Sequence, residues 1–342
     1  MRLLSRIGFL LWRISRIFLL LALVLVIIGY FMISMPGSNP AGELPALTAE
    51  QLEIKTGLER HVQHLAGVIG ERNTGSGDSL AATANYIDGE FRNMGLTPHR
   101  LEYQAGDKGA FVNIEVELYG TTAADEILVL GAHYDTSWIT PGADDNASGV
   151  AVLLEIARAL AEDRLPRTIR FVAFPNEEFP HFGTSRMGSK AYAKRLRDRD
   201  DNVIGMWSLE MLGYYDDTPG SQRFPNVMRY FYPDTGDFIA FVGNLKSRGF
   251  VHDSISVYRK NASVPAEGIA APVMLVPDVR RSDHYMFWQN GYPALMVTNT
   301  AGFRNPHYHR KTDKPGTLDY ERMTHVVSGL TTTVRNLAGA TD

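Results

Sequence analysis

The residues of this 342-residue chain that are best suited to chemistry are histidines and carboxylates that follow predicted strands. Imidazole and carboxylate groups are the ligands that zinc uses where thiolates are absent. In α/β sheets, active sites gather at the edge where the carboxyl ends of parallel strands meet. We therefore expect side chains far apart in the sequence to form one site. The set comprises His133, Asp135, Asp145, Glu177, Glu178, Glu210, Tyr308 and His309.

A carboxylate able to reach two metal ions is the central requirement of such a site. Two zinc ions about 3.5–4 Å apart need one shared carboxylate, at least one further ligand each, and space for a water. Asp145 is the natural bridge, because it lies in a glycine-containing loop at residues 141–149 that leads into a predicted helix. Asp144 can instead face away and brace the loop. Spacing alone does not decide which of the two aspartates bridges.

Two short pairs could supply further ligands and a base. Asp135 lies two residues after His133, so strand alternation puts both side chains on one face, where the carboxylate can orient the imidazole. Glu177 and Glu178 point apart, so one can bind metal while the other acts as general base. Taken alone, either pair is more often structural. The Asp145 loop ten residues after His133, and the buried strand predicted just before the glutamates, favour the functional interpretation.

Two more candidates lie further along the chain. Glu210 falls within an apolar run, where an unpaired carboxylate is costly and a metal would remove that cost. His309 is followed by Asp313, which we predict to be its hydrogen-bonding partner. His307 is a rival metal ligand on spacing alone.

Composition narrows the classes of function. The hydrophobic fraction of 44% and charged fraction of 21% are those of a globular protein. Formal net charge is −4; residues 1–35 hold four arginines and no acid, so the remaining 30 basic and 38 acidic residues give −8. This balance argues against nucleic acid as a partner. Cysteine is absent, which excludes disulfides and thiolate metal sites. The sequence gives no indication of oligomeric state.

The first 35 residues predict a membrane segment. Residues 17–35 are uncharged, and 19 positions at about 1.5 Å each span about 28 Å, close to the hydrocarbon thickness of a bilayer. We interpret residues 1–35 as a cytoplasmic basic stub and transmembrane signal-anchor. The positive-inside rule then places the rest outside the cytoplasm, in the periplasm or extracellular space. A cleaved signal peptide, giving a secreted protein, is the alternative. Residues 36–47 are predicted to be a linker and residues 48–342 the catalytic domain.

From Thr48 onward the patterns alternate between helix and strand, which predicts an α/β fold. A capping box at Thr48–Gln51 predicts a helix to about Gly67. Residues 214–279 give no clear local pattern, and we expect them to cover one side of the site. The other predicted elements are a helix from Asp78 to Met94, strands at 97–103 and 112–119, strands before His133, Glu177, Glu210 and the His309 loop, and a helix ending at Ala161.

These motifs, in this order, resemble a known family. The chain is similar from about Ala49 to Leu337 to the co-catalytic di-zinc exopeptidases of the bacterial aminopeptidase and glutamate carboxypeptidase type, peptidase clan MH, family twenty-eight. The motifs are His133-x-Asp135, the 142–149 loop Gly-Ala-Asp-Asp-Asn-Ala-Ser-Gly, Glu177-Glu178, Gly188-Ser189, Ser282-Asp283-His284 and Tyr308-His309.

The resemblance implies a fold and a site. The fold would be a three-layer α/β/α arrangement with a mixed, mostly parallel central sheet. His133 and Glu210 would hold one zinc, Glu178 and His309 the other, and Asp145 would bridge. Asp135 would support His133, Glu177 would be the general base, and Tyr308 would stabilise the oxyanion. Asp283 and His284 would form a structural element nearby. Cobalt or manganese could replace zinc on the same ligands.

Two departures from the family pattern concern the site. The family usually has aspartate where Glu210 stands, and Gly188-Ser189 comes later than usual after the glutamate pair. The extra residues between are expected to shape the substrate pocket.

The resulting hypothesis is a membrane-anchored, zinc-dependent aminopeptidase acting on peptides. A single-zinc enzyme like the glutaminyl-peptide cyclotransferases and a non-catalytic binding ectodomain are the alternatives. Residue preference, and aminopeptidase against carboxypeptidase specificity, are open at this point.

Overall fold

The computed structural model of the chain describes residues 2–104, 110–224 and 226–340, which form two compact units, one ending at Ser34 and one beginning at Met35. The first unit is the helix α1 (Arg2–Ile33). Its stretch Trp12–Ile33 has a mean hydropathy of 2.7 and is the one helix in the described ranges that is long and apolar enough to cross a membrane. A membrane span and a signal sequence share this length and composition.

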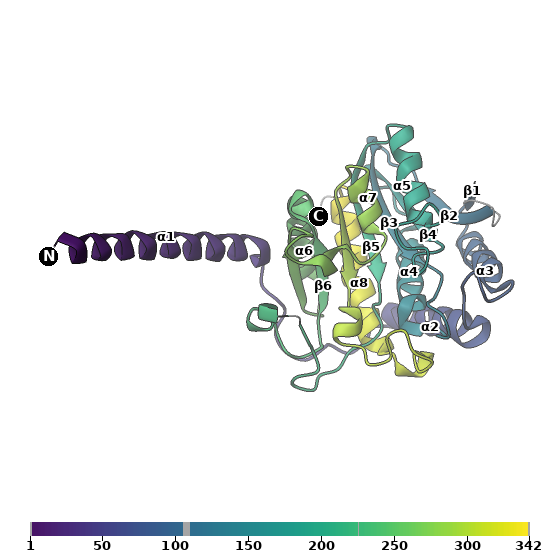
Figure 1. Ribbon diagram of the computed structural model, residues 1–342. Coiled ribbons are helices and arrows are strands. Elements are labelled where there is room, and N and C mark those ends of the chain that lie inside the picture. The colour runs from purple at the N-terminus through teal and green to yellow at the C-terminus, as the bar shows by residue number, and fades with distance from the viewer. Residues whose placement is uncertain (1, 105–109, 225, 341–342) are drawn as a thin grey trace. The chain divides into compact units, whose positions relative to one another are not determined.

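A single mixed sheet organises the second unit (Figure 1). Among the described residues it has eight strands in the order β1-β2-β4-β3-β5-β8-β6-β7. The neighbours β4-β3-β5-β8 run parallel, as do β6 and β7. The pairs β1–β2, β2–β4 and β8–β6 are antiparallel. The strands are β1 (His99–Gln104), β2 (Ala110–Leu118), β3 (Ala123–His133), β4 (Arg167–Phe174), β5 (Val203–Glu210), β6 (Ile239–Gly243), β7 (Ala266–Ala270) and β8 (Ala294–Thr298).

Helices cover both faces of this sheet, which confirms the predicted three-layer fold (Figure 1). Strand alternation explains the two cores: in β4, Phe171 packs into the larger cluster, and Val172 into the smaller one on the other face. The larger cluster lies under α2 (Ala49–Val62), α3 (Ser79–Asn93), α4 (Gly149–Leu160), α6 (Arg248–Asn261) and α8 (Tyr320–Leu337), and the smaller under α5 (Gly188–Asp198) and α7 (His284–Gln289).

The predicted helix starts agree with the structure except in one detail. Thr48 and Gln51 form the expected reciprocal capping box of α2, and the helical path continues through η1 (Gln63–Ile69) to Gly70. Asp78 precedes α3 as predicted, but its side chain makes no capping hydrogen bond. The short turns η3 (Ala143–Ser148), η4 (Asn226–Tyr230), η5 (Leu245–Ser247), η6 (Pro277–Arg280), η7 (Ala301–Phe303) and η8 (Pro315–Thr317) complete the list.

Met35, predicted to end the membrane segment, and residues 36–45 of the predicted linker belong to the second unit. Arg259 of α6 donates from Nη1 to the carbonyls of Pro36 and Gly37, at 3.1 and 3.3 Å. Asn39 accepts the N–H of Ala266 at 2.9 Å and donates to Glu267 Oε1 at 2.8 Å, both on edge strand β7. We call residues 35–45 the N-terminal strap.

Candidate metal centre

The ends of three adjacent parallel strands bring the predicted ligands together. His133 and Glu210 are the last residues of β3 and β5, and Glu178 lies in the turn after β4. Asp145 lies in η3, directly before α4. His309 lies in the loop after β8 with a φ of 56°. The predicted gathering at one sheet edge is therefore what the structure shows.

Asp145 faces two separate groups of ligand atoms. Its Oδ1 lies 3.4 Å from His133 Nε2, which is also 3.4 Å from Glu210 Oε2. Its Oδ2 lies 3.1 Å from His309 Nε2, which is also 3.1 Å from Glu178 Oε1. In each group the three ligand atoms lie within 4.8 Å of one another. The side chain of Glu210 thus brings its carboxylate into the first of these groups.

The charges of this cluster fit metal cations. Asp145 Oδ1 and Glu178 Oε1 are buried and accept no hydrogen bond from the described residues. Burial lowers the pKa of His133, but the nearby carboxylates of Glu210, Asp135 and Asp145 outweigh it and raise that pKa well above its usual value. The pKa of His309 is raised to about 10: burial lowers it, and Asp145 and Glu178 more than compensate. The cluster gathers several carboxylates around two imidazoles, and bound divalent ions would neutralise that concentration of negative charge.

Asp135 connects the histidine to the glutamate pair. Its Oδ1 lies 3.4 Å from His133 Nδ1 and accepts the N–H of Glu177 at 3.0 Å. Its Oδ2 accepts the N–H of Glu178 at 3.1 Å. The carboxylate predicted to orient His133 therefore also fixes the turn that carries both glutamates.

The Asp145 loop is braced from outside the ligand groups. Asp144 faces away from them, accepting the N–H of Gly213 at 2.7 Å and the side-chain amides of Asn299 and Asn305 at 2.8 and 2.7 Å. Our prediction that Asp313 pairs with His309 is wrong. The Asp313 carboxylate instead accepts the N–H groups of Asp144 and Asp145 at 2.8 and 3.1 Å.

Arg72 is a buried positioning residue that sequence reasoning missed. Its side chain is fully buried, and its guanidinium donates only to backbone carbonyls. Nε donates to Tyr134 at 3.0 Å, and Nη2 to Gly142 at 2.8 Å. Nη1 donates to Leu65, Gly70 and Pro141, at 3.0, 2.8 and 2.7 Å. Arg72 thus ties the end of β3 to the Asp145 loop.

Glu210 is held by the Ser-Asp-His segment. Ser282 donates to Glu210 Oε2 at 2.6 Å and its hydroxyl lies 2.7 Å from that of Ser208. Burial raises the pKa of Asp283 to about 7. Buried His284 donates from Nε2 to the carbonyl of Val279 at 2.7 Å. Ser282 thus supports the carboxylate of Glu210, and the structural role that the resemblance implies for Asp283 and His284 stays a prediction.

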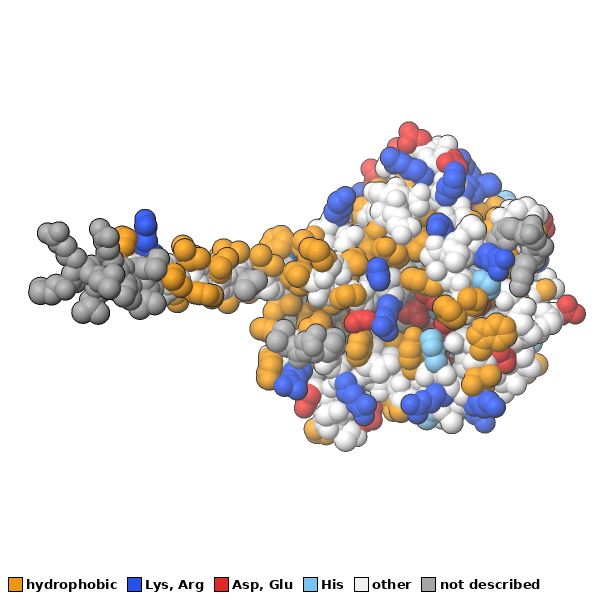
Figure 2. All heavy atoms as spheres, in the orientation of Figure 1, with side chains coloured by type: hydrophobic (Ala, Val, Ile, Leu, Met, Phe, Trp, Pro, Cys, Tyr) orange, Lys and Arg blue, Asp and Glu red, His pale blue; other side chains and the backbone are white. Residues whose placement is uncertain are grey.

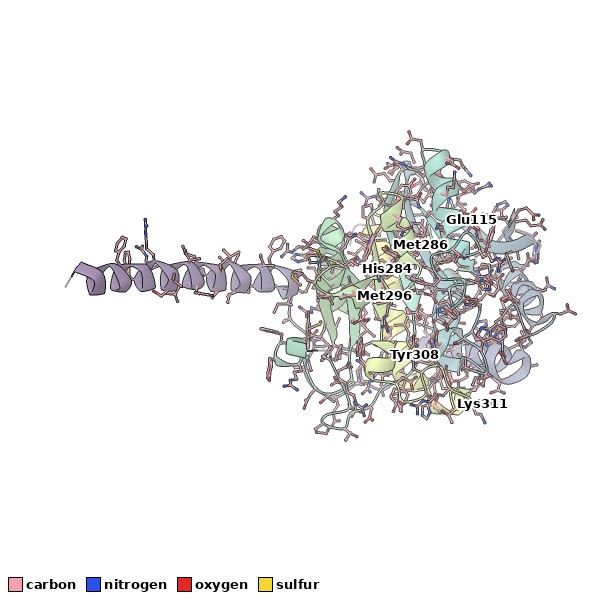
Figure 3. The ribbon with its side chains drawn as sticks, in the orientation of Figure 1. Glu115, His284, Met286, Met296, Tyr308 and Lys311 are labelled. Atoms are coloured by element: carbon pink, nitrogen blue, oxygen red, sulfur yellow. The ribbon has the colours of Figure 1, made fainter. Side chains whose placement is uncertain are left out.

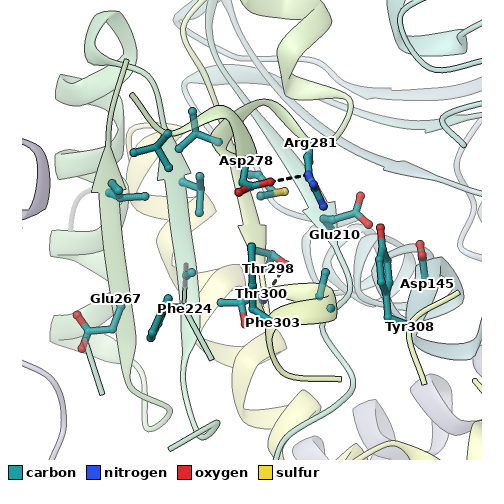
Figure 4. Close-up of a pocket in the computed structure, with 18 of the residues that line it drawn as sticks. Asp145, Glu210, Phe224, Glu267, Asp278, Arg281, Thr298, Thr300, Phe303 and Tyr308 are labelled. Carbon is teal, nitrogen blue, oxygen red and sulfur yellow. Dashed lines mark hydrogen bonds and ion pairs between the residues drawn. The ribbon is translucent and has the colours of Figure 1, made fainter. Parts of the chain in front are cut away.

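The candidate base and oxyanion donor lie beside the ligand groups. Burial, with the charges of Glu210 and Glu178, raises the pKa of Glu177 well above its usual value. The Tyr308 ring stacks on His309 at 3.8 Å, and in Figure 4 it lies between Glu210 and Asp145. Burial and the nearby carboxylates raise the pKa of Tyr308, so its hydroxyl stays protonated. His307, the rival ligand, instead faces Thr312 at 2.9 Å.

A cavity of about 550 Å³ opens beside these residues. Its floor includes four residues in register across the sheet, Glu210, Thr298, Ala240 and Glu267. Three strand spacings of about 4.8 Å make this row about 14 Å long. Met296 and Tyr308, labelled in Figure 3, also line the cavity. Figure 2 shows acidic side chains in a hollow bordered by hydrophobic ones.

The cavity walls come from segments that were hard to interpret in the sequence. Phe179 and Phe182 belong to the extra residues after the glutamate pair, so these residues do shape the pocket. Phe224, Met228, Tyr232 and Phe238 come from the segment between β5 and β6. These wall residues carried no motif. Asn299, which binds Asp144, directly follows the hydrophobic run of β8 and could have been found by the rule that located the ligands.

Comparisons with known proteins give the family and the fold. The model of peptidase family M28 matches residues 113–334. The uncharacterized protein YfbL of Escherichia coli K12 is 37% identical over 289 residues, covering 82% of this chain and 87% of the relative. A zinc aminopeptidase from Bacillus subtilis superposes with a TM-score of 0.66 at 15% identity, covering 86% of this chain and 96% of that one. A glutaminyl cyclase from Fimbriiglobus ruber gives 0.60 at 17% identity, over 88% and 99%.

Proposed function

The chain belongs to peptidase family M28, a family of zinc-dependent peptidases, and from this membership we propose that it is an aminopeptidase that holds two zinc ions. The observation that carries the proposal is Asp145, whose two oxygens face two different histidine–carboxylate groups. We assign His133 and Glu210 to one zinc, Glu178 and His309 to the other, and Asp145 to both.

Each remaining side chain has one task in this proposal. Bound zinc would polarise the scissile carbonyl and lower the pKa of the attacking water. Glu177 takes a proton from that water and passes it to the leaving amine. Tyr308 donates a hydrogen bond from its hydroxyl to the developing oxyanion. Asp135 holds His133 and the glutamate turn in place.

The electrostatics of the cavity favour recognition of a free amine. Arg281 is the one Lys or Arg among the described lining residues, and it is already paired with Asp278 at 2.7 Å (Figure 4). A substrate carboxylate would have to compete with Asp278 for that guanidinium. A carboxypeptidase would be expected to offer a free cation instead.

The first experiment measures zinc per chain together with hydrolysis of a panel of amino-acid anilides. Two zinc ions and chelator-sensitive release of aniline support the proposal. One zinc per chain, with cyclisation of peptides that begin with glutamine, would replace it with the cyclotransferase alternative. Binding of peptides without turnover would indicate a non-catalytic ectodomain.

A substitution of Glu177 tests its role separately from metal binding. Glu177→Ala should keep both zinc ions and lose about 10²–10⁴-fold in kcat, the range for a general base. Glu162→Gln, which changes an exposed glutamate after α4, is the control and should retain activity. Normal turnover by Glu177→Ala would refute the assignment.

We further propose that α1 anchors the peptidase in the membrane with residues 48–342 as an extracytoplasmic catalytic domain and residues 36–47 as its connection. The four arginines before the apolar stretch support this orientation. Protease added to spheroplasts, in which only the plasma membrane is intact, should digest the catalytic domain, and protection of that domain until the membrane is lysed would reverse the orientation.

A further inference from the structure

Large aromatic side chains face solvent on the segment that also forms one wall of the cavity. We call residues 226–231 the interface loop. Tyr230 is 70% exposed and Phe231 60% exposed. The Arg229 guanidinium lies 4.9 Å from the centre of the Tyr230 ring. Exposed aromatic residues beside an arginine are typical of protein surfaces at the membrane–water boundary.

The interface loop is fixed to the edge of the sheet near the start of the second unit. Tyr232, which follows the loop, donates its hydroxyl to the carbonyl of Gly268 on β7 at 2.8 Å. Met35 packs on the same glycine, since a Cβ added there would lie 2.8 Å from Met35 Cγ. Arg259 holds the next residues of the N-terminal strap.

Chain connectivity then brings this region close to any membrane that α1 crosses. The helix ends at Ile33, two residues before Met35. Two residues of extended chain reach at most about 7 Å. The end of the apolar span must therefore lie within about 7 Å of Met35. Tyr232 and Met35 both contact Gly268, so the interface loop is attached to the sheet beside the residue that follows the apolar span.

We propose that the interface loop inserts Tyr230 and Phe231 into the headgroup region of the bilayer, as a second membrane contact beside α1. Arg229 would then face lipid phosphates. The inference depends on α1 as a membrane span and is independent of the catalytic proposal. Met228 and Tyr232 line the cavity on the same segment, so the cavity would open close to the bilayer surface, within reach of membrane-associated peptides.

The absence of cysteine makes a direct test possible in the full chain. Phe231→Cys, labelled with an environment-sensitive fluorophore, is reconstituted in nanodiscs at one chain per disc. Tyr119→Cys is the matched control, because Tyr119 is an aromatic residue 74% exposed that follows β2, near the opposite edge of the sheet. Val24→Cys reports whether α1 lies in the bilayer.

We expect emission from the label at position 231 to move to shorter wavelength and to be quenched by lipids that carry nitroxides near the headgroup. The label at position 119 should show no shift and no quenching. The Val24 label should be quenched by nitroxides deep in the acyl chains. Identical behaviour at positions 231 and 119 would overturn the proposal. A wavelength shift at position 231 without lipid quenching would mean that protein, not lipid, covers the loop. An unquenched Val24 label would mean that α1 does not cross the bilayer. Either result would also overturn the proposal.

Discussion

Replacing Arg72 with methionine should destabilise the fold and loosen the metal centre together. The buried carbonyl of Tyr134 would lose its bond from Arg72 without gaining water, whereas the carbonyls of Leu65 and Gly142 each keep a second bond from a backbone N–H. An unsatisfied buried acceptor costs about 1–3 kcal/mol and each of the four other lost bonds about 0.5–1.5 kcal/mol, which gives about 3–9 kcal/mol in all. Methionine avoids the cost of burying the guanidinium charge, which offsets a few kcal/mol. We expect a net loss of about 3–5 kcal/mol in the free energy of unfolding.

The assay is urea unfolding of the full chain in detergent micelles, with zinc affinity measured by chelator competition. Arg170→Met is the matched control, since Arg170 is also buried but pairs with Glu117 and Asp201, apart from the metal centre. It should lose stability with zinc affinity nearly unchanged, whereas Arg72→Met should also lose about 10–100-fold in zinc affinity, as for other supporting residues. An Arg72→Met chain within about 1 kcal/mol of the parent, with unchanged affinity, would refute the reasoning.

Two further predictions concern zinc and pH. Chelation should lower the midpoint of thermal unfolding, because zinc at about a thousand times its Kd stabilises the folded chain by about 4 kcal/mol. His307→Ala should keep this dependence on zinc, and His309→Ala should weaken it. Equal responses of the two variants would contradict the ligand assignment. Burial lowers the pKa of His284 from the usual histidine value of about 6.5 to about 4. The contribution of neutral His284 to stability is therefore fully present above about pH 6.5 and is lost as pH falls towards 4. At about 1.4 kcal/mol per pH unit, the difference in unfolding free energy between the parent and His284→Gln should change by about 3 kcal/mol over that range, and a constant difference would exclude His284 as the source.

The ligand positions could be predicted because each depends on local pattern. His133 and Glu210 end hydrophobic runs that form adjacent parallel strands, so placing the strands placed the side chains. Asp145 needed the family resemblance to be preferred over Asp144, since adjacent residues in an irregular loop have no periodicity. The order of strands beyond β8 could not be predicted, because β6 and β7 are five-residue strands in a long irregular region.

The supports of the site could not be predicted, because their partners are backbone atoms far away in sequence. Arg72 bonds carbonyls up to 70 residues away and leaves no motif. Asp313 was assigned to His309 because the two are close in sequence, but its carboxylate turns to N–H groups 169 and 168 residues away. Such contacts depend on the folded path of the main chain rather than on side-chain spacing.

Because β6 and β7 lie apart from the metal centre, changes in the cavity lining can occur separately from changes in the proposed ligands. The proposed ligands come from β3, β5, the turn after β4, the η3 loop and the loop after β8, whereas the far floor of the cavity and several wall residues come from residues 214–279. That stretch contributes no proposed ligand or base, so it can lengthen, shorten or exchange residues while the chemistry stays intact. Relatives that share the same catalytic residues can therefore diverge in substrate preference through changes in one continuous stretch of the gene. That stretch could also be exchanged between relatives by protein engineering.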